Sequence, residues 1–279
     1  MKRLLRLSDL DKSEVYKIFR IADELQCGKY SDFLKGRTIV MFFPEASIRT
    51  RVTFERGIYL LGGQTILFPP ASLDKKEKLQ DVAGYLNNWA DGAVIRHKEI
   101  LVLEEMAKYA EFPIINAMTD INHPCEMLAD MYALSKIRED FTEDKFLFVG
   151  AGGNIGKAWR EASELMGFSL TQSCPPEYAM EGVENIEDLE QAVSGKDIIC
   201  TDSLSTEKLQ AFGKHQVTLD IMKKANENAL LNPCPPFYRG EEVSADAIDS
   251  DYFVGYSFKK YLLEIQQAVL IYCLTKGGR

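Results

Sequence analysis

Short apolar segments rich in β-branched residues alternate along this chain with longer segments of helical periodicity, in two separate series. In the first series we predict strands at residues 38–43, 64–68, 92–96 and 113–116. In the second series we predict strands at residues 146–150, 169–174, 197–202 and 229–232. Strands that alternate with helices form parallel sheets with right-handed crossovers. The sequence therefore predicts an α/β fold of two doubly wound parallel-sheet domains, with a ligand site in the cleft between their strand ends.

Helical periodicity fills the spaces between these strands. The predicted helices cover residues 13–26, 48–61, 79–90, 99–109, 125–138, 155–166, 186–193, 218–224 and 256–276. The last of them is apolar on most of its faces, which predicts that it is buried between other elements. The helix at residues 125–138 is expected to leave the first domain.

Composition and charge narrow the function classes. The 279 residues carry a net charge of −9, so the chain lacks the basic field that draws nucleic acid or anionic membranes. The six cysteines occur singly and without metal-ligand spacing, which is typical of free thiols in a reducing compartment. We find no signal-peptide pattern and no uncharged apolar run of about 18 residues. We therefore expect a cytoplasmic protein with no metal ion.

The sequence Ser47-Ile48-Arg49-Thr50-Arg51 lies between a predicted strand and a predicted helix. Ser47 stands where a helix N-cap belongs. The first turn of a helix exposes unpaired N–H groups and the positive end of the helix dipole, and hydroxyl and guanidinium groups add further donors. The segment therefore predicts a phosphate site. The alternative is an ordinary capped helix with surface arginines.

Two further strand ends carry polar residues at the same predicted sheet edge. Arg96 ends the third strand, and His123 follows the fourth. Pro124 fits the first position of a helix, which places the imidazole of His123 at the cap. Both side chains are then expected to reach a ligand held at the first helix. Taken alone, Arg96 could be solvated and His123 an ordinary surface or core residue, and we interpret His97 as structural.

Together these motifs resemble those of the aspartate and ornithine carbamoyltransferases. Residues 42–55, Phe-Phe-x-Glu-Ala-Ser-x-Arg-Thr-Arg-x-x-Phe-Glu, resemble the carbamoyl-phosphate motif of that family. Arg-His at 96–97 and His-Pro-Cys-Glu at 123–126 resemble two more of its motifs. The resemblance implies a carbamoyltransferase in which an amine or amino acid attacks the carbamoyl carbon of carbamoyl phosphate and phosphate leaves. It implies neither a metal ion nor an organic cofactor.

The resemblance also implies how the chain is divided and assembled. Residues 1–136 together with 257–279 are expected to form the carbamoyl-phosphate domain, and residues 140–256 the acceptor domain. Lys75 falls where aspartate carbamoyltransferases insert a lysine into the site of the neighbouring subunit. A homotrimer with shared active sites is therefore expected, with no nucleic-acid or membrane partner.

By the same resemblance, specific residues are expected to bind carbamoyl phosphate. The residues expected to polarise the carbonyl are Arg49, Thr50, Arg96 and His123, and Ser47, Arg49, Thr50, Arg96 and Lys75 are expected to hold the phosphate. The wider binding set is Ser47, Ile48, Arg49, Thr50, Lys75, Arg96, His123, Glu126, Pro233 and Cys234. Asn-Pro-Cys-Pro at 232–235 is similar to a family loop whose carbonyls hold the carbamoyl amide and which contains a cis bond. Here the cis bond is expected between Cys234 and Pro235.

Three positions depart from the family pattern. Ile48 replaces a threonine and so removes a hydroxyl, and Asn232 replaces a histidine. Glu126 replaces a glutamine. Its carboxylate can accept a hydrogen bond from the carbamoyl NH2 or from an acceptor amine, and so tune specificity. Alternatively, it can repel the phosphate or tie up His123 as an ion pair.

The acceptor residues match the family less closely. The expected acceptor-binding residues are Asn154, Lys157, Asp202 and Arg239. Asp202 resembles an aspartate of ornithine enzymes that meets the amino group of the acceptor, and Asn154 matches an asparagine of the same enzymes. Lys157 and Arg239 stand near positions where aspartate enzymes carry arginines. The match favours ornithine or a related amine over aspartate, which remains the alternative acceptor.

A glycine-rich turn at residues 150–157 supports another function. It follows a strand and opens a helix, as in NAD(P)-dependent dehydrogenases. Its Gly-x-Gly-x-x-x-Gly spacing departs from the dinucleotide fingerprint, and the next strand ends without a ribose-binding acid. A further alternative is a carbamoyl-phosphate-binding homologue without turnover, which Glu126 and Asn232 would allow.

Overall fold

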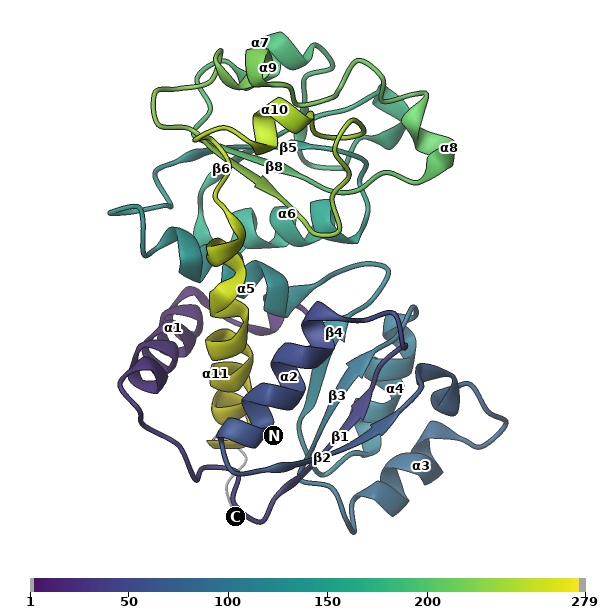
Figure 1. Ribbon diagram of the computed structural model, residues 1–279. Coiled ribbons are helices and arrows are strands. Elements are labelled where there is room, and N and C mark those ends of the chain that lie inside the picture. The colour runs from purple at the N-terminus through teal and green to yellow at the C-terminus, as the bar shows by residue number, and fades with distance from the viewer. Residues whose placement is uncertain (1–2, 276–279) are drawn as a thin grey trace. The chain divides into compact units, whose positions relative to one another are not determined.

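The computed structural model describes residues 3–275 and divides the chain into two compact units (Figure 1). Unit 1 comprises Met1–Ala133 and Lys259–Arg279, and unit 2 comprises Leu134–Phe258. Each unit has its own parallel sheet. The predicted α/β fold with two parallel-sheet domains is therefore confirmed.

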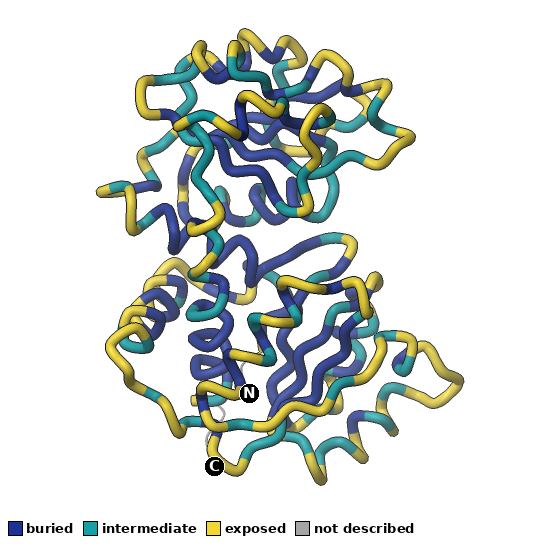
Figure 2. Tube along the Cα trace, viewed as in Figure 1, coloured by how far each residue is buried: buried dark blue, intermediate teal, exposed yellow. Residues whose placement is uncertain are grey.

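Unit 1 contains a four-stranded sheet in the order β2-β1-β3-β4, in which every adjacent pair is parallel. The strands are β1 (Thr38–Phe42), β2 (Gln64–Phe68), β3 (Gly92–Arg96) and β4 (Ile114–Met118). All four predicted strands are confirmed. Figure 2 shows that β1, β3 and β4 are buried, whereas the edge strand β2 is largely exposed. Because the strands are parallel, their carboxyl ends meet at one edge of the sheet.

Helices cover both faces of this sheet. They are α1 (Lys12–Gln26), α2 (Arg49–Leu60), α3 (Leu79–Leu86), α4 (Ile100–Tyr109), α5 (Pro124–Leu134) and α11 (Leu262–Thr275), with short 3-10 segments at Leu7–Asp9 and Pro70–Leu73. Apolar side chains of α3 and α4 pack against alternate residues of β1 and β3. On the other face, α11 packs against α1 and α2 (Figure 1).

Three predicted helices of unit 1 end or begin differently from the prediction. The last one opens as a 3-10 segment, η4 (Tyr256–Tyr261), before α11 begins at Leu262. Most of α11 is buried, which confirms the prediction made from its apolar faces. The helices α3 and α5 end at Leu86 and Leu134, each four residues before its predicted end.

Unit 2 contains a five-stranded parallel sheet in the order β7-β6-β5-β8-β9. The strands are β5 (Lys145–Val149), β6 (Ser169–Ser173), β7 (Glu184–Asn185), β8 (Ile198–Thr201) and β9 (Leu230–Pro233). The helices are α6 (Asn154–Met166), α7 (Leu189–Val193), α8 (Thr206–Leu209), α9 (Leu219–Met222) and α10 (Ala245–Ile248), with a 3-10 turn at Pro176–Tyr178. The four predicted strands are confirmed, whereas β7, α8 and α10 were not predicted.

One part of the core of unit 2 lies between its sheet and three short helices. Side chains of α7, α9 and α10 pack there against Leu147, Ile199 and Leu231 of the central strands. Figure 1 shows α6 on the opposite side of the sheet. Across residues 3–275, no helix has the length and apolar character needed to cross a membrane. All six cysteines are free thiols, as predicted.

Candidate active site

Two strand ends of unit 1 are joined by a direct contact. Arg96, at the end of β3, donates a hydrogen bond from Nη1 to Ser47 Oγ at 3.0 Å. Ser47 lies in the loop that leads from β1 into α2, and it is only 3% exposed. This contact places the Arg96 guanidinium group beside the segment that leads into α2, while its contact with a ligand stays a prediction.

The start of α2 corrects one sequence prediction. The N-cap residue is Ile48, and no side chain caps the helix. The prediction that Ser47 caps this helix was therefore wrong, because its hydroxyl accepts from Arg96 instead. The first turn, which begins at Arg49, still presents the N–H groups that an α-helix leaves without intrahelical partners. Helix dipole, N–H groups and nearby guanidinium groups together suit an anion.

The two arginines of this segment differ in their surroundings. Arg49 is exposed at the first helical position, next to buried Thr50. Arg51 is occupied one turn along the helix, where its Nε donates to Glu55 Oε1 at 2.8 Å. Arg49, rather than Arg51, is therefore the guanidinium group available at the helix start.

His123 is buried immediately before α5, which begins at Pro124 as predicted. The pKa of His123 is lowered to about 4, mainly by burial; Glu126 opposes this shift, and the charges of Arg96 and Lys259 add to it. The imidazole is therefore neutral near pH 7, with one N–H donor and one acceptor nitrogen. Within residues 3–275, its Nδ1 has no hydrogen-bond partner. A neutral, buried imidazole whose Nδ1 has no partner within the described residues is suited to polarise a bound carbonyl.

A buried hydrogen-bond network holds the turn that carries His123. Asn122 Oδ1 accepts from Asn116 Nδ2 at 2.6 Å and from Thr119 Oγ1 at 3.0 Å. Asn122 Nδ2 donates to the carbonyl of Leu5 at 3.3 Å. Sequence reasoning missed these supporting residues, although Asn122 directly precedes the His-Pro motif. The network fixes the backbone turn that carries His123 before any ligand binds, and such preorganisation favours electrostatic catalysis.

Glu126 has a partner that the sequence did not suggest. It is 5% exposed, and its Oε1 accepts from Lys259 Nζ at 2.9 Å. Burial alone would raise the pKa of Glu126, but nearby positive charge, above all the Lys259 ammonium, outweighs burial and lowers it. Because His123 is neutral, the proposed Glu126–His123 ion pair is replaced by an ion pair between Glu126 and Lys259.

Lys75 is exposed in the segment between the 3-10 turn η2 (Pro70–Leu73) and α3. The neighbouring Asp74 is held by His97, whose Nε2 lies 2.9 Å from Asp74 Oδ1. The N–H of Glu99 donates a hydrogen bond to His97 Nδ1 at 3.0 Å. His97 thus anchors the start of the lysine-rich loop, in agreement with its structural interpretation.

Unit 2 brings a second group of predicted residues to the carboxyl edge of its sheet. Asp202 follows β8, and its Oδ1 accepts from the N–H of Ser203 at 2.9 Å. Burial raises the pKa of Asp202 to about 7. Cys234, at the end of β9, donates its N–H to the carbonyl of Thr201 at 3.0 Å, so the ends of β8 and β9 lie together.

Of the other predicted acceptor residues, Asn154 and Lys157 lie at the start of α6, whereas Arg239 lies on the surface. Asn154 begins α6, and its Oδ1 accepts from the N–H of Ile155 at 3.0 Å, while Lys157 is half-buried one turn later. Arg239 is exposed and donates to Asp249 Oδ1 at 3.2 Å. The structure therefore does not bring Arg239 to Asp202 through any described contact.

The cis peptide bond lies one residue beyond its predicted position. The structure has it between Pro235 and Pro236, so the prediction of a cis Cys234–Pro235 bond was wrong. Both bonds precede a proline, whose tertiary amide reduces the preference for trans. The sequence alone therefore gives no physical reason to choose between them.

The glycine-rich turn of unit 2 is packed by protein side chains. A Cβ atom on Gly156 would lie 2.7 Å from Phe148 Cε1, and one on Gly152 would lie 2.9 Å from Met180 Cγ. These glycines are therefore required by internal packing, which removes the need for a nucleotide phosphate to explain them.

A Gly156→Ala substitution is expected to lower the free energy of unfolding by about 1–3 kcal/mol, because the added methyl group overpacks the contact with Phe148. Gly153→Ala is the matched control, since its Cβ would have 3.8 Å to the carbonyl oxygen of Ala151 and the φ angle of Gly153 is −79°. Urea unfolding measures both. Equal losses would show that the turn requires glycine for backbone reasons instead.

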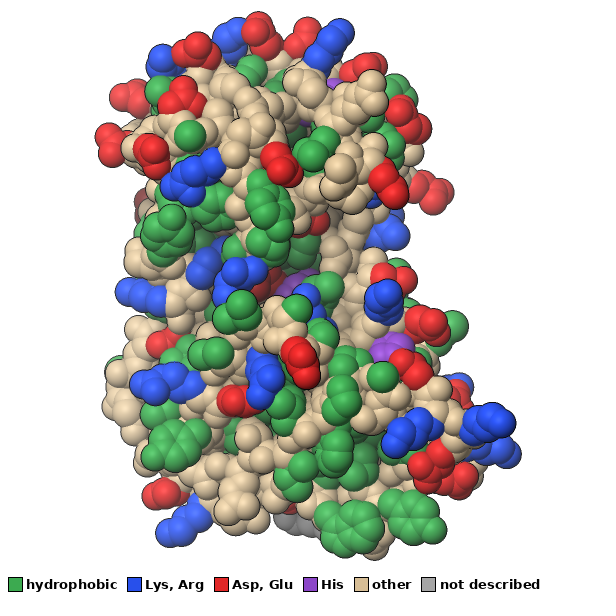
Figure 3. Space-filling view, turned by 45° about the vertical axis from the view of Figure 1, so that its right-hand side comes forward, with side chains coloured by type: hydrophobic (Ala, Val, Ile, Leu, Met, Phe, Trp, Pro, Cys, Tyr) green, Lys and Arg blue, Asp and Glu red, His purple; other side chains and the backbone are tan. Residues whose placement is uncertain are grey.

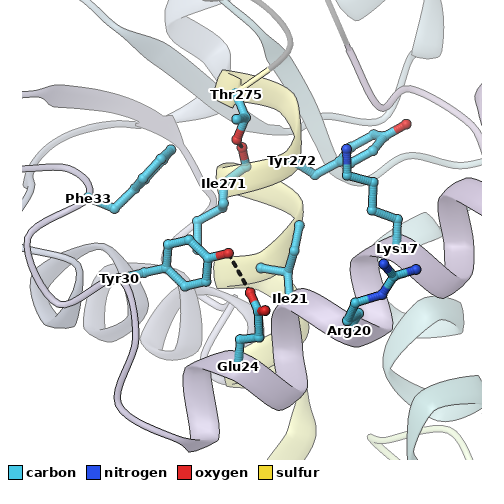
Figure 4. A pocket seen from close by; sticks show the side chains of 9 residues that line it. All are labelled: Lys17, Arg20, Ile21, Glu24, Tyr30, Phe33, Ile271, Tyr272 and Thr275. Atoms are coloured by element: carbon cyan, nitrogen blue, oxygen red, sulfur yellow. Dashed lines mark hydrogen bonds between the residues drawn. The ribbon is translucent and has the colours of Figure 1, made fainter.

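Unit 1 also contains a cavity apart from these strand ends (Figure 4). Its volume is about 260 Å³, and its walls come from α1, the loop after it and α11. The lining residues are Lys17, Arg20, Ile21, Glu24, Tyr30, Phe33, Ile271, Tyr272 and Thr275. Tyr30 closes one side by donating to Glu24 Oε2 at 2.6 Å. None of these residues belongs to the predicted site.

Comparison with known proteins identifies the class. Residues 2–136 match the family model "Aspartate/ornithine carbamoyltransferase, carbamoyl-P binding domain". Residues 142–273 match the model "Aspartate/ornithine carbamoyltransferase, Asp/Orn binding domain". Together with the two parallel sheets, these matches define a carbamoyltransferase. The chain belongs to the aspartate/ornithine carbamoyltransferase family.

Within this family, the chain is similar to several proteins named ornithine carbamoyltransferase. Ornithine carbamoyltransferase of Hydrogenovibrio crunogenus is 34% identical, with 99% of each chain covered. The protein of the same name from Halorhodospira halophila is 32% identical, with 97% of this chain and 98% of that protein covered. Ornithine carbamoyltransferase from Pyrococcus furiosus has a similar structure, with a TM-score of 0.92 at 29% identity and coverage of 98% and 97%. The predicted family is thus confirmed.

Proposed function

We propose that this protein transfers the carbamoyl group of carbamoyl phosphate to ornithine and releases phosphate. The observation that carries the proposal is the hydrogen bond between Arg96 and Ser47 at the start of α2, in the same unit as neutral His123. Full-length similarity to ornithine carbamoyltransferases supports the choice of acceptor.

In this proposal, unit 1 binds and activates carbamoyl phosphate. The first-turn N–H groups of α2, with Ser47 and Thr50, hold the phosphate oxygens. Arg49 and Arg96 supply positive charge, and His123 donates to the carbonyl oxygen as it becomes an oxyanion. The amine nitrogen forms a bond to the carbamoyl carbon, the carbon–oxygen bond to phosphate breaks, and the amine loses a proton. Positioning and charge stabilisation provide the rate without a covalent enzyme intermediate.

In this proposal, unit 2 recognises the acceptor. Asp202 in its ionised form is suited to an ammonium group, and Asn154 and Lys157 at the start of α6 are suited to polar and carboxylate groups. The backbone carbonyl groups of Pro233 and Cys234 accept hydrogen bonds from the NH2 of the carbamoyl group. Arg239 is given no role in acceptor binding, because its guanidinium group binds Asp249 on the surface.

A phosphate-release assay with carbamoyl phosphate and a panel of amines tests the function. Ornithine is expected to give the fastest release among ornithine, aspartate, putrescine and lysine. Faster release with aspartate would contradict the assignment of the acceptor. Binding of carbamoyl phosphate without release with any amine would indicate a homologue without turnover. Fluorescence enhancement of NADH or NADPH on addition of the protein would favour the dehydrogenase alternative.

We also infer a homotrimer in which Lys75 completes the site of a neighbouring subunit. The exposed edge strand β2 carries Ile66 and Phe68, which are 47% and 40% exposed. Ile48 and Val52 of the adjoining segment are 69% and 55% exposed. Figure 3 shows hydrophobic side chains among charged ones on the molecular surface. An unpaired edge strand with apolar side chains is typical of a surface that another chain covers.

The trimer is expected to have about three times the 31.6 kDa mass of the chain in light scattering. Mixing inactive Lys75→Ala chains with inactive His123→Ala chains should restore part of the activity, because some hybrid sites then contain both wild-type residues. Mixing each variant with itself is the control. A monomeric mass, or hybrids without activity, would contradict shared sites. The free cysteines support a reducing, cytoplasmic location for this assembly.

A further inference from the structure

Two buried carboxylates of α5 share one ammonium group. Glu126 and Asp130 are four residues apart and therefore lie on the same face of the helix. Their side chains are 7% and 3% exposed. Lys259 Nζ donates to Glu126 Oε1 at 2.9 Å and to Asp130 Oδ1 at 2.6 Å. Buried carboxylates are costly without such a partner, so the position of this lysine matters to both.

The segment that carries Lys259 is held in place by a second contact. Lys259 lies within η4, just before α11. Two residues later, the ring of Tyr261 packs edge-on against Tyr132 of α5, with centroids 5.2 Å apart. The buried helix α11 continues from there. The ammonium group is therefore delivered to α5 by fixed packing rather than by a mobile surface side chain.

The carboxylate of Glu126 places a negative charge near the proposed anion site, although an anion is stabilised by positive charge. It lies in the first turn of α5, three residues after His123, and the positive charge of Arg49 at the start of α2 acts on it. Like charges within a few ångströms of each other repel strongly in a site that is partly shielded from water. A dianionic phosphate at α2 would therefore be disfavoured if the carboxylate of Glu126 had no nearby cation.

We propose that Lys259 is a positioning residue for carbamoyl phosphate, which neutralises Glu126 and holds its carboxylate in the ion pair so that the site accepts a dianion. The proposal rests on the proposed function of the same site. It explains how the chain keeps a carboxylate at a position where the family usually carries a neutral glutamine. Asp130 orients the lysine, because it binds the same ammonium group one helical turn further from His123.

Carbamoyl-phosphate titration calorimetry on the full-length protein tests this role. Lys259→Met is expected to raise the Kd by about tenfold or more, because Glu126 then acts on the phosphate without compensation. Lys259→Arg should stay within about threefold of wild type, since it keeps the charge. Glu126→Gln should change the Kd by less than about threefold in the wild-type background but lower it by about tenfold in the Lys259→Met background.

Asp130→Asn in the Lys259→Met background is the matched control. It removes the same charge one helical turn away, about 6 Å along the axis, so it should raise the melting temperature without restoring affinity. If Asp130→Asn and Glu126→Gln restore affinity equally, Lys259 has only a structural role and the proposal is overturned. Unchanged affinity in a folded Lys259→Met protein would overturn it as well.

A variant lacking all three charges covers the case in which Lys259→Met does not fold. The triple variant Glu126→Gln, Asp130→Asn, Lys259→Met has no buried carboxylate to compensate, and it should bind within about threefold of wild type. A folded triple variant that binds tenfold more weakly would show that Lys259 contacts the ligand itself, contrary to the proposal. If wild type binds no carbamoyl phosphate, the proposed function fails first and this inference with it, whereas normal wild-type binding isolates failure of the inference.

Discussion

An Arg49→Ala protein should keep its fold and lose at least about thirtyfold in affinity for carbamoyl phosphate. Arg49 is exposed at the first position of α2, so its truncation leaves no cavity in the core. One charge-assisted partner of a phosphate in a preorganised site contributes about 2–4 kcal/mol, which corresponds to that change in Kd. Calorimetric titration gives the affinity, and circular dichroism checks the fold.

Arg51→Ala is the control for this prediction. It removes the same chemical group two residues further along α2, where Glu55 already occupies the guanidinium group. Its effect on affinity should be at most a few fold, because the lost interaction is a partly exposed pair on one helix. Equal losses in the two variants would indicate a general effect of surface charge, and an unaffected Arg49→Ala protein would place the phosphate elsewhere.

Binding of the acceptor should weaken by about tenfold between pH 8 and pH 6, through the titration of Asp202. Burial raises the pKa of this carboxyl to about 7, so it is ionised above that pH and protonated below it. The protonated form cannot pair with an ammonium group, and occupancy of the ionised form falls about tenfold over this range. L-norvaline, which has the α-amino and carboxylate groups of ornithine but no side-chain amine, permits calorimetry without turnover.

Asp202→Asn should bind norvaline about a hundredfold more weakly at pH 8 and should show a nearly flat profile between pH 6 and pH 8. The amide keeps the size of the side chain and still accepts from the N–H of Ser203, but it has no charge for the ammonium group. Asp249→Asn, at the surface pair with Arg239, is the control and should retain the wild-type profile. A steep profile that persists in Asp202→Asn would assign the titration to another group.

Local patterns predicted the sheets well because central parallel strands are continuous apolar runs. Two such runs form strands at the positions predicted from their β-branched residues, namely Thr38–Phe42 and Gly92–Arg96. The two-residue strand β7, Glu184–Asn185, has no such run, because it is a polar segment at the edge of the sheet, where it pairs with β6. Its formation depends on the neighbouring strand and not on its own composition.

The candidate site was predictable where function depends on residues close in sequence, and less so where it depends on distant partners. The motif at the start of α2 was recognisable, but the loss of the Ser47 cap follows from Arg96, which lies 49 residues away. Likewise, the ionic state of Glu126 follows from Lys259, which lies 133 residues away. No local sequence pattern predicts either of these contacts.

The path of the chain between the units has a practical consequence for protein engineering. Unit 2 is one continuous insertion, Leu134–Phe258, within unit 1. The two ends of unit 1 that flank it are already tied together, because Tyr132 packs on Tyr261 and Asp130 binds Lys259. A linker of a few residues from Ala133 to Lys259 should therefore close unit 1 without unit 2. Any acceptor-recognising module whose own ends lie equally close could be grafted at the same junction.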